Sequence, residues 1–139
     1  MEPSARQLAF HGAVVLLFGL LCGGPYARAI NRGAPPHIVQ AWRMAHASLP
    51  MGATLMIAVS AVLSHFATAP AVKWTIAVSL AVSSYAFCLS LPLGATVGHR
   101  GLSSGGPLSA RLVYAGNMLG AGASLVGAVA LVYASLVSL

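Results

Sequence analysis

The chain has 139 residues, of which 58% are hydrophobic and only 6% are charged, and its formal net charge is +6. This composition is typical of membrane proteins and excludes an ordinary soluble domain. The positive charge does not indicate a nucleic-acid partner, because the basic residues are scattered singly near the ends of apolar runs, with no basic face interleaved with aromatic residues. We therefore treat residues 1–139 as one membrane domain.

Four apolar stretches predict transmembrane helices. Each is near or above the roughly 20 residues that are needed to cross a hydrocarbon core about 30 Å thick. The predicted helices cover residues 8–24, 39–66, 72–93 and 110–137. The expected fold is an all-α membrane protein, a four-helix bundle in the lipid bilayer.

The first helix is followed by a segment rich in helix breakers. Pro25, Gly33, Pro35 and Pro36 predict that residues 25–37 form a structured connector. An alternative is a cleaved secretory signal, because residues 27–29 read Ala-Arg-Ala, a pattern like that of a cleavage site. We expect the helix to be retained.

The second helix places Trp42, His46 and Pro50 at intervals of four residues, on one face. Pro50 lacks the backbone N–H that would bond to the carbonyl of His46, so a local kink is expected at His46.

The last two helices follow a short turn and a long loop. The turn around Pro70 predicts that the second and third helices are antiparallel neighbours. The loop at residues 94–109 is rich in Gly and Ser, and it is expected either to move or to cap an entrance. The fourth helix carries small residues at spacing four, which pack helices within one chain or form an oligomer interface: Gly116, Gly120, Ser124 and Ala128.

The basic residues predict the orientation. Arg6 and Lys73 belong to one end of the bundle, and five arginines belong to the other: Arg28, Arg32, Arg43, Arg100 and Arg111. By the positive-inside rule the arginine-rich end faces the cytoplasm, with both termini outside. The expected location is a cytoplasmic (inner) membrane of the bacterial type. Cys22 and Cys88 lie in apolar runs and are expected to be packing residues.

His46 is the most informative residue, because it lies in an apolar run without carboxylates and Glu2 is the only acidic residue in the chain. An ionisable group at membrane depth is costly and is usually functional. One interpretation is a neutral core residue that is hydrogen-bonded across the bundle, and the other is a metal or haem ligand. A single imidazole suits haem, since the porphyrin supplies the other four bonds, whereas zinc or copper needs several converging side chains.

The remaining histidines provide no obvious cluster. His37, His65 and His99 lie in or beside loops and are expected to be solvated. His11 is the one other histidine placed to approach the bundle, as a hydrogen-bond partner or a second axial ligand. Arg43, about one turn before His46, is placed to reach an anionic group such as a haem propionate.

Three segments resemble the styrene oxide isomerases, small four-helix membrane enzymes that contain haem b. The similarity loosely covers nearly the whole chain and rests on the order and spacing of these segments. They are His11-Gly12, the stretch with Trp42, Ala45-His46, Pro50 and Met56-Ile57-Ala58-Val59, and Arg100-Gly101-Leu102.

The resemblance implies that His46 is the axial ligand of a haem b held between neighbouring subunits of a homotrimer. It also implies that ferric iron acts as a Lewis acid on a small apolar epoxide such as an aryl epoxide, which opens towards a benzylic cation and gives an aldehyde by a hydride shift. The other candidate cofactor-binding residues are Trp42, Arg43, His11 and Arg100.

The family has an asparagine, a tyrosine and an aspartate where this chain has Gly52, Leu91 and Ser83. Three other polar residues either face the pocket or pack between helices: Tyr85, Tyr114 and Asn117. Two other functions are consistent with the pattern. One is a haem protein for electron transfer, haem storage or gas sensing, and the other is a transporter or membrane assembly subunit, although proton-coupled export normally needs an embedded carboxylate.

Overall fold

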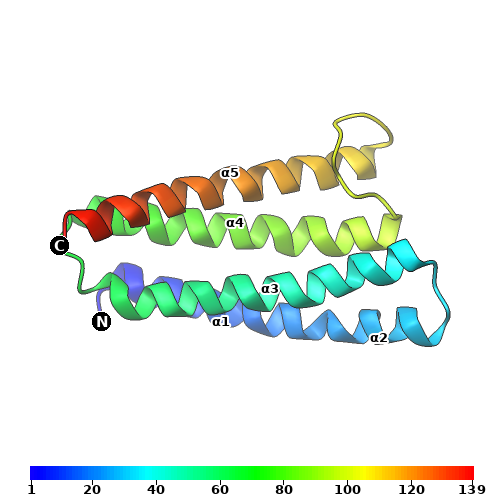
Figure 1. Cartoon of the computed structure of the whole chain (residues 1–139), viewed down its shortest axis with the longest axis horizontal. Coiled ribbons are helices and arrows are strands. Elements are labelled where there is room, and N and C mark those ends of the chain that lie inside the picture. The colour runs from blue at the N-terminus through cyan, green and yellow to red at the C-terminus, as the bar shows by residue number, and fades with distance from the viewer.

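A computed structural model describes residues 1–139 and contains helices but no strands (Figure 1). The helices are α1 (Pro3–Leu21), α2 (Gly23–Asn31), α3 (Pro36–Leu63), α4 (Pro70–Val97) and α5 (Leu108–Leu136). Four segments are long and apolar enough to cross a membrane, and the first of them, Pro3–Asn31, combines α1 and α2. The prediction of an all-α fold with four transmembrane segments is confirmed.

The predicted connector at residues 25–37 is wrong over most of its length. α2 occupies Gly23–Asn31, and the connector to α3 shrinks to residues 32–35. Pro25 is tolerated because it lies in the first turn of α2, where its missing N–H would have no partner within the helix. The chain then turns at Gly33, whose φ of 62° suits a residue without a side chain.

Internal prolines do not interrupt the helices. α3 continues through Pro50 and α4 continues through Pro92. The kink expected at His46 does not break α3, which Figure 1 draws as one continuous helix. The hydroxyl of Thr54 donates to the Pro50 carbonyl at 2.8 Å, and α1 packs directly against Pro50 through Gly19. These two contacts show how Pro50 is packed, and neither provides a donor for the carbonyl of His46.

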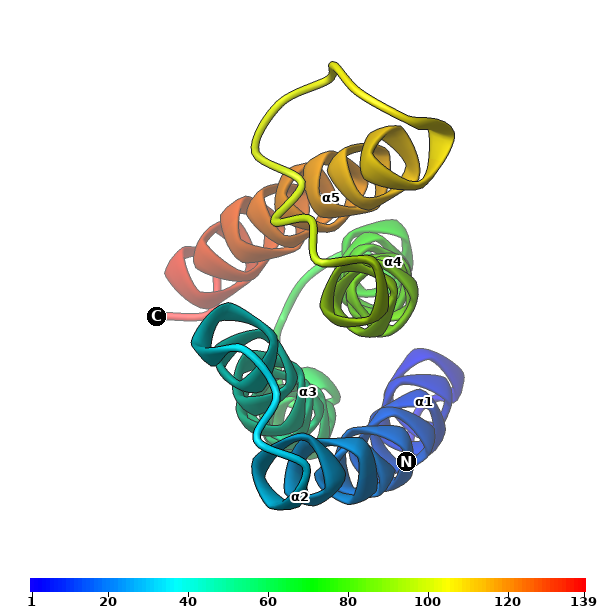
Figure 2. The same ribbon diagram turned by 90° about the vertical axis from the view of Figure 1, so that its right-hand side faces the viewer.

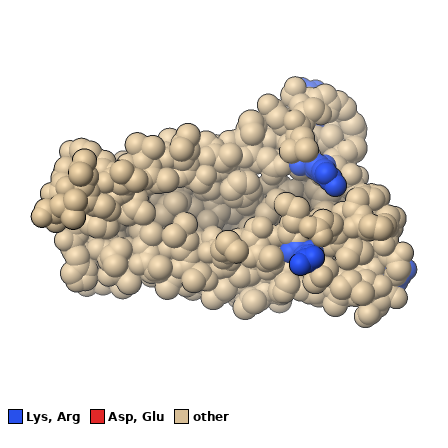
Figure 3. All heavy atoms as spheres, in the orientation of Figure 1, with Lys and Arg blue, Asp and Glu red and all other residues tan.

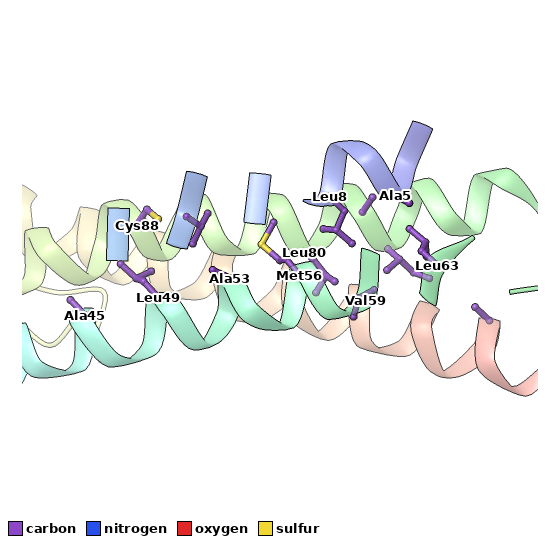
Figure 4. Packing of buried hydrophobic residues seen from close by; sticks show 14 of the residues in the cluster. Ala5, Leu8, Ala45, Leu49, Ala53, Met56, Val59, Leu63, Leu80 and Cys88 are labelled. Atoms are coloured by element: carbon purple, nitrogen blue, oxygen red, sulfur yellow. The ribbon is translucent and has the colours of Figure 1, made fainter. Parts of the chain in front are cut away.

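The helices pack as two antiparallel pairs joined through α3 and α4 (Figure 2). α1 packs mainly on α3, and α5 contacts no helix other than α4. The core lies where α1, α3 and α4 meet, and many of its side chains are small, which lets the backbones approach closely (Figure 4). Cys22 and Cys88 are free thiols in this core, as expected for packing residues.

The small-residue stripe of α5 packs within the chain at two of its four positions. A Cβ on Gly116 would lie 2.8 Å from Ser90 Cβ, and one on Gly120 would lie 2.8 Å from the Phe87 ring. Farther along the stripe, Ala128 is exposed. The stripe therefore seats α5 on α4, which supports the interpretation that it packs helices of one subunit.

The arginine-rich end and the opposite end differ in charge. Five arginines gather at one end of the bundle (Figures 1 and 3). Arg28 and Arg32 lie at the end of α2, Arg43 lies in the third turn of α3, Arg100 lies in the 98–107 loop, and Arg111 lies in the first turn of α5. At the other end Lys73 pairs with Glu2 at 2.9 Å, with side chains that are 11% and 26% exposed. Arg6 is thus the one unpaired basic side chain there.

Replacing Glu2 by glutamine is expected to lower the free energy of unfolding in detergent by about 1 to 3 kcal/mol, because the largely buried Lys73 ammonium loses its charged partner. The measurement is thermal or denaturant unfolding beside Arg6→Gln, which removes an exposed charge. Equal stability of Glu2→Gln and wild type would show that the ion pair contributes nothing.

Candidate functional site

The imidazole of His46 is held by a carbonyl of the neighbouring helix. His46 is partly buried, and its Nδ1 lies 3.0 Å from the carbonyl oxygen of Gly19 in the last turn of α1. Carbonyls in the last turn of a helix lack partners within the helix, so this oxygen is free to accept. A carbonyl cannot donate, hence Nδ1 carries the proton and Nε2 keeps its lone pair. The geometry selects the tautomer that ligates a metal through Nε2.

Residues of α2 complete the surroundings of the ring. A Cβ on Gly23 would lie 3.0 Å from His46 Cε1, so only glycine fits beside the imidazole without displacing it. The ring of Tyr26 is stacked near that of His46, with centroids 6.1 Å apart and planes inclined by 29°. The α1–α2 segment therefore contacts His46 through one hydrogen bond and two packing contacts.

The two other predicted ligand-binding residues of α3 have different environments. Trp42, one turn before His46, is partly buried and packs on the hydrophobic core. Arg43 is exposed. The carboxylate of Glu2 lies at the opposite end of the bundle, paired with Lys73, so His46 has no anionic side chain beside it.

His11 does not lie beside His46. Its Nδ1 is 2.8 Å from the hydroxyl of Tyr85 on α4. The neighbouring Gly12 packs against Ala53, which is seven residues beyond His46, or about 10 Å along α3. The structure therefore gives His11 the role of a hydrogen-bond partner across the bundle, and does not support a second axial ligand from the same chain.

The donor set fits haem better than a metal held by protein ligands alone. The chain brings no group of three or more histidine, cysteine or acidic side chains together. A zinc or copper site needs such convergence. A single imidazole of fixed tautomer suffices for haem, and ligating histidines typically donate their other ring N–H to a carbonyl or carboxylate, as His46 does to Gly19.

A pocket of about 410 Å³ opens at the arginine-rich end, between α3, α4 and α5 and beneath the 98–107 loop. Figure 3 shows the surface hollowed at this end, with basic side chains on both sides. The pocket uses the face of α3 opposite to His46, which is not among its lining residues. Those residues are His37, Gln40, Ala41, Met44, Ser90, Leu91, Gly94, Ala95, Gly98, His99, Arg100, Leu102, Val113 and Asn117.

Three residues that the sequence analysis singled out thus line this pocket: Leu91, Arg100 and Asn117. The others do not line it: Gly52, Ser83, Tyr85 and Tyr114. Ser83 is buried and donates to the carbonyl of Gly120 at 2.7 Å. His99, expected to be a solvated loop residue, is partly buried at the pocket.

The 98–107 loop caps the pocket, which was one of the two roles expected for it. Gly101 has a φ of 62°, and a Cβ there would lie 2.6 Å from a Val113 methyl and 2.7 Å from Asn117 Nδ2. This close approach lets Asn117 Nδ2 donate to the carbonyls of Arg100 at 3.2 Å and Gly101 at 3.4 Å. The glycine of the Arg-Gly-Leu segment therefore has a structural role, because its lack of a side chain lets the loop pack closely against α5.

Several contacts were missed by the sequence analysis. The carbonyl of Gly19, the ring of Tyr26 and the close approach of Gly23 all depend on α2, which was expected to be part of a connector. The one available signal was the run from Gly23 to Pro25, which also fits the first turn of a helix.

A comparison with known families agrees with this arrangement. No curated protein matches the chain significantly. The family model described as styrene oxide isomerase matches residues 4–136, a range that includes His46, the loop that caps the pocket and all four transmembrane segments except Pro3. Because the match covers nearly the whole chain, this protein belongs to the styrene oxide isomerase family.

Proposed function

We propose that the protein binds haem b through Nε2 of His46 and isomerises a small, mainly apolar epoxide to an aldehyde. One observation carries the cofactor assignment: the Gly19 carbonyl fixes His46 as the Nδ1–H tautomer, which leaves Nε2 as a metal ligand. Membership of the family supports the reaction class. When bound, ferric haem supplies a Lewis acid that polarises the epoxide oxygen.

The surroundings of His46 orient the imidazole. Donation from Nδ1 to the Gly19 carbonyl holds the plane of the ring and leaves the lone pair on Nε2. Gly23 and Tyr26 of α2 lie beside the ring and limit its movement. With no carboxylate close by, nothing in the chain competes for the proton on Nδ1.

The proposed reaction needs neither an acid nor a base from the protein. The benzylic C–O bond breaks, a hydride moves from the adjacent carbon to the benzylic carbon, and the oxygen and that adjacent carbon form the aldehyde. Atoms and electrons balance within the substrate, so no proton, reductant or oxidant enters. This suits a membrane domain whose one carboxylate, Glu2, is paired with Lys73. The apolar walls exclude water that would trap a cation as a diol.

We extend the proposal to a homotrimer in which neighbouring subunits hold the haem, as the family resemblance implies. In one chain, His46 and the pocket lie on opposite faces of α3. A site made of His46 from one subunit and the pocket of the next would bring ligand and substrate together. Arg43 is exposed beside His46 and is available to pair with a propionate.

The proposed location is the cytoplasmic membrane of a bacterial-type cell. The arginine-rich end, which includes the mouth of the pocket, would face the cytoplasm by the positive-inside rule. The pairing of Lys73 with Glu2 increases the difference in charge between the two ends.

The proposed reaction is tested by adding haem in steps to the haem-free protein in detergent and incubating each sample with styrene oxide. We expect phenylacetaldehyde to form in proportion to bound haem, without added reductant. The protein without haem and haem in empty micelles are the controls. Formation of diol alone, or no aldehyde from fully loaded protein, would contradict the proposal.

Gly23→Ala is expected to weaken haem binding about fivefold, because the added Cβ would lie 3.0 Å from His46 Cε1 and must push the ring aside at a cost of about 1 kcal/mol. The measurement is haem titration followed by absorption. Gly24→Ala is the matched control, since a Cβ at that position contacts nothing within 4 Å. The same affinity in both variants would show that Gly23 does not position the imidazole.

A further inference from the structure

An arginine without an anionic partner lies at the mouth of the pocket beneath the 98–107 loop. Arg100 is exposed and is one of the residues that line this pocket. The chain has one acidic side chain, Glu2, which is paired with Lys73 at the opposite end of the bundle. No acidic side chain is visible beside the hollow in Figure 3. The mouth of the pocket therefore offers a positive charge that no side chain of the protein neutralises.

Two histidines line the same pocket and flank this arginine. His37, in the first turn of α3, reaches the end of α4, because its Nε2 lies 3.8 Å from the position of a Cβ on Gly98. Gly98 is the C-cap of α4 and is followed directly by His99 and Arg100. The backbone of His99 is fixed there, since its N–H donates to the carbonyl of Gly94 at 3.1 Å. Basic side chains from α3 and from the start of the loop thus meet at one opening.

The interior of the pocket provides apolar walls. They come from α3, α4 and α5 and include Ala41, Leu91, Ala95 and Val113. Ala95 and Val113 are 1% and 2% exposed, so this part of the wall belongs to the interior of the bundle. The volume of about 410 Å³ lies within the range of roughly 300 to 1,000 Å³ that is usual for sites of drug-sized ligands. A cavity of this kind, with a cationic mouth, fits a molecule that has an apolar body and an anionic group at one end.

We propose that this pocket binds an amphipathic carboxylate, whose apolar body lies between α3, α4 and α5 and whose carboxylate pairs with the guanidinium of Arg100. An arginine suits this group because it can donate two parallel N–H bonds to the two carboxylate oxygens. A phospholipid shares the chemistry, but most of its two acyl chains would lie outside a capped cavity of this volume. The inference deepens the proposed function, and it rests on that function only in naming epoxides that carry a carboxylate as the preferred substrate class.

The test compares the affinities of 3-phenylpropionate and 3-phenylpropionamide, which are similar in size and differ in charge. Binding to the haem-free full chain in an uncharged detergent is measured by isothermal titration calorimetry for wild type, Arg100→Gln and Arg111→Gln. Arg111 is the matched control, because it is an exposed arginine at the same end of the bundle that does not line the pocket. The ratio of the two affinities in each protein is the readout, since partition into micelles is the same for all three proteins.

Wild type and Arg111→Gln are expected to prefer the carboxylate. Arg100→Gln is expected to lose this preference about three- to tenfold, an effect between those of an exposed ion pair and of a buried hydrogen bond to a charged group. An unchanged affinity ratio in Arg100→Gln would overturn the inference. An equal loss in Arg111→Gln would also overturn it, because the preference would then reflect the net charge of this end and not a site.

Two further comparisons identify the source of the anion. The difference between wild type and Arg100→Gln is measured again in nanodiscs with and without phosphatidylglycerol, and again in haem-loaded protein. We expect the difference to persist in each case. Its loss with the anionic lipid would assign Arg100 to a lipid phosphate, and its loss with haem would assign Arg100 to a propionate, so either result would overturn the inference. The inference would stand if styrene oxide were not isomerised while the carboxylate preference persisted, so its failure and that of the proposed function are distinguishable.

Discussion

Replacing His46 by alanine is expected to abolish specific haem binding. In the proposed site the imidazole is the one metal ligand, and the chain has no group of three or more histidine, cysteine or acidic side chains that could replace it. We expect the Soret band of the purified variant to disappear and its affinity for added haem to fall by more than about 100-fold. This loss exceeds the effect that is usual when only a residue hydrogen-bonded to a metal ligand is removed. The measurement is absorption during haem titration in detergent.

The matched control is His65→Ala, which removes an exposed histidine that follows α3. This variant is expected to bind haem as wild type does. His11→Ala is also expected to keep its haem spectrum, because its ring is bonded to Tyr85. A wild-type Soret band in His46→Ala, or its loss in His65→Ala, would contradict the assignment.

Replacing Gly19 by alanine is expected to destabilise the bundle and to weaken haem binding together. A Cβ at Gly19 would lie 2.5 Å from Pro50 Cδ and 2.9 Å from Leu49 Cβ, and neither atom can rotate away from its backbone. α1 must therefore move off α3, which costs about 3 kcal/mol by overpacking. The same movement draws the Gly19 carbonyl away from His46 Nδ1. The measurements are denaturant unfolding and haem titration of the same preparation.

Gly122→Ala is the control for this variant. Gly122 also lies inside a transmembrane helix, α5, but a Cβ there contacts nothing within 4 Å. Alanine has the higher helix propensity, so this variant is expected to be as stable as wild type or more stable by up to about 1 kcal/mol. If Gly19→Ala were equally harmless, the close packing of α1 on Pro50 would be refuted.

The sequence predicted the features that follow from composition and the spacing of apolar residues. The apolar runs predicted the four transmembrane segments. The short turn before Pro70 predicted that the helices on either side of it, α3 and α4, are antiparallel neighbours. Pro25 was misread as part of a connector, because it lies in the first turn of α2, where its missing N–H has no cost. Pro50 lies inside α3, as the predicted helix at residues 39–66 required.

The candidate site was predictable only in part. A histidine in an apolar run without carboxylates indicated a special role for His46, but the tautomer depends on the Gly19 carbonyl, which a distant segment brings to it. His11 was placed correctly on the first helix, yet the sequence could not show that its ring meets Tyr85 instead of His46.

The resonance Raman spectrum of the reduced, haem-loaded protein tests the central claim most directly, because it reports the protein ligand and the coordination number of the iron. We predict a single iron–histidine stretching band from a five-coordinate haem, present in wild type and His11→Ala and absent in His46→Ala. A six-coordinate, low-spin spectrum without this band in wild type, or a band that survives the loss of His46, would contradict ligation by Nε2 of His46 with the opposite face of the haem open to substrate.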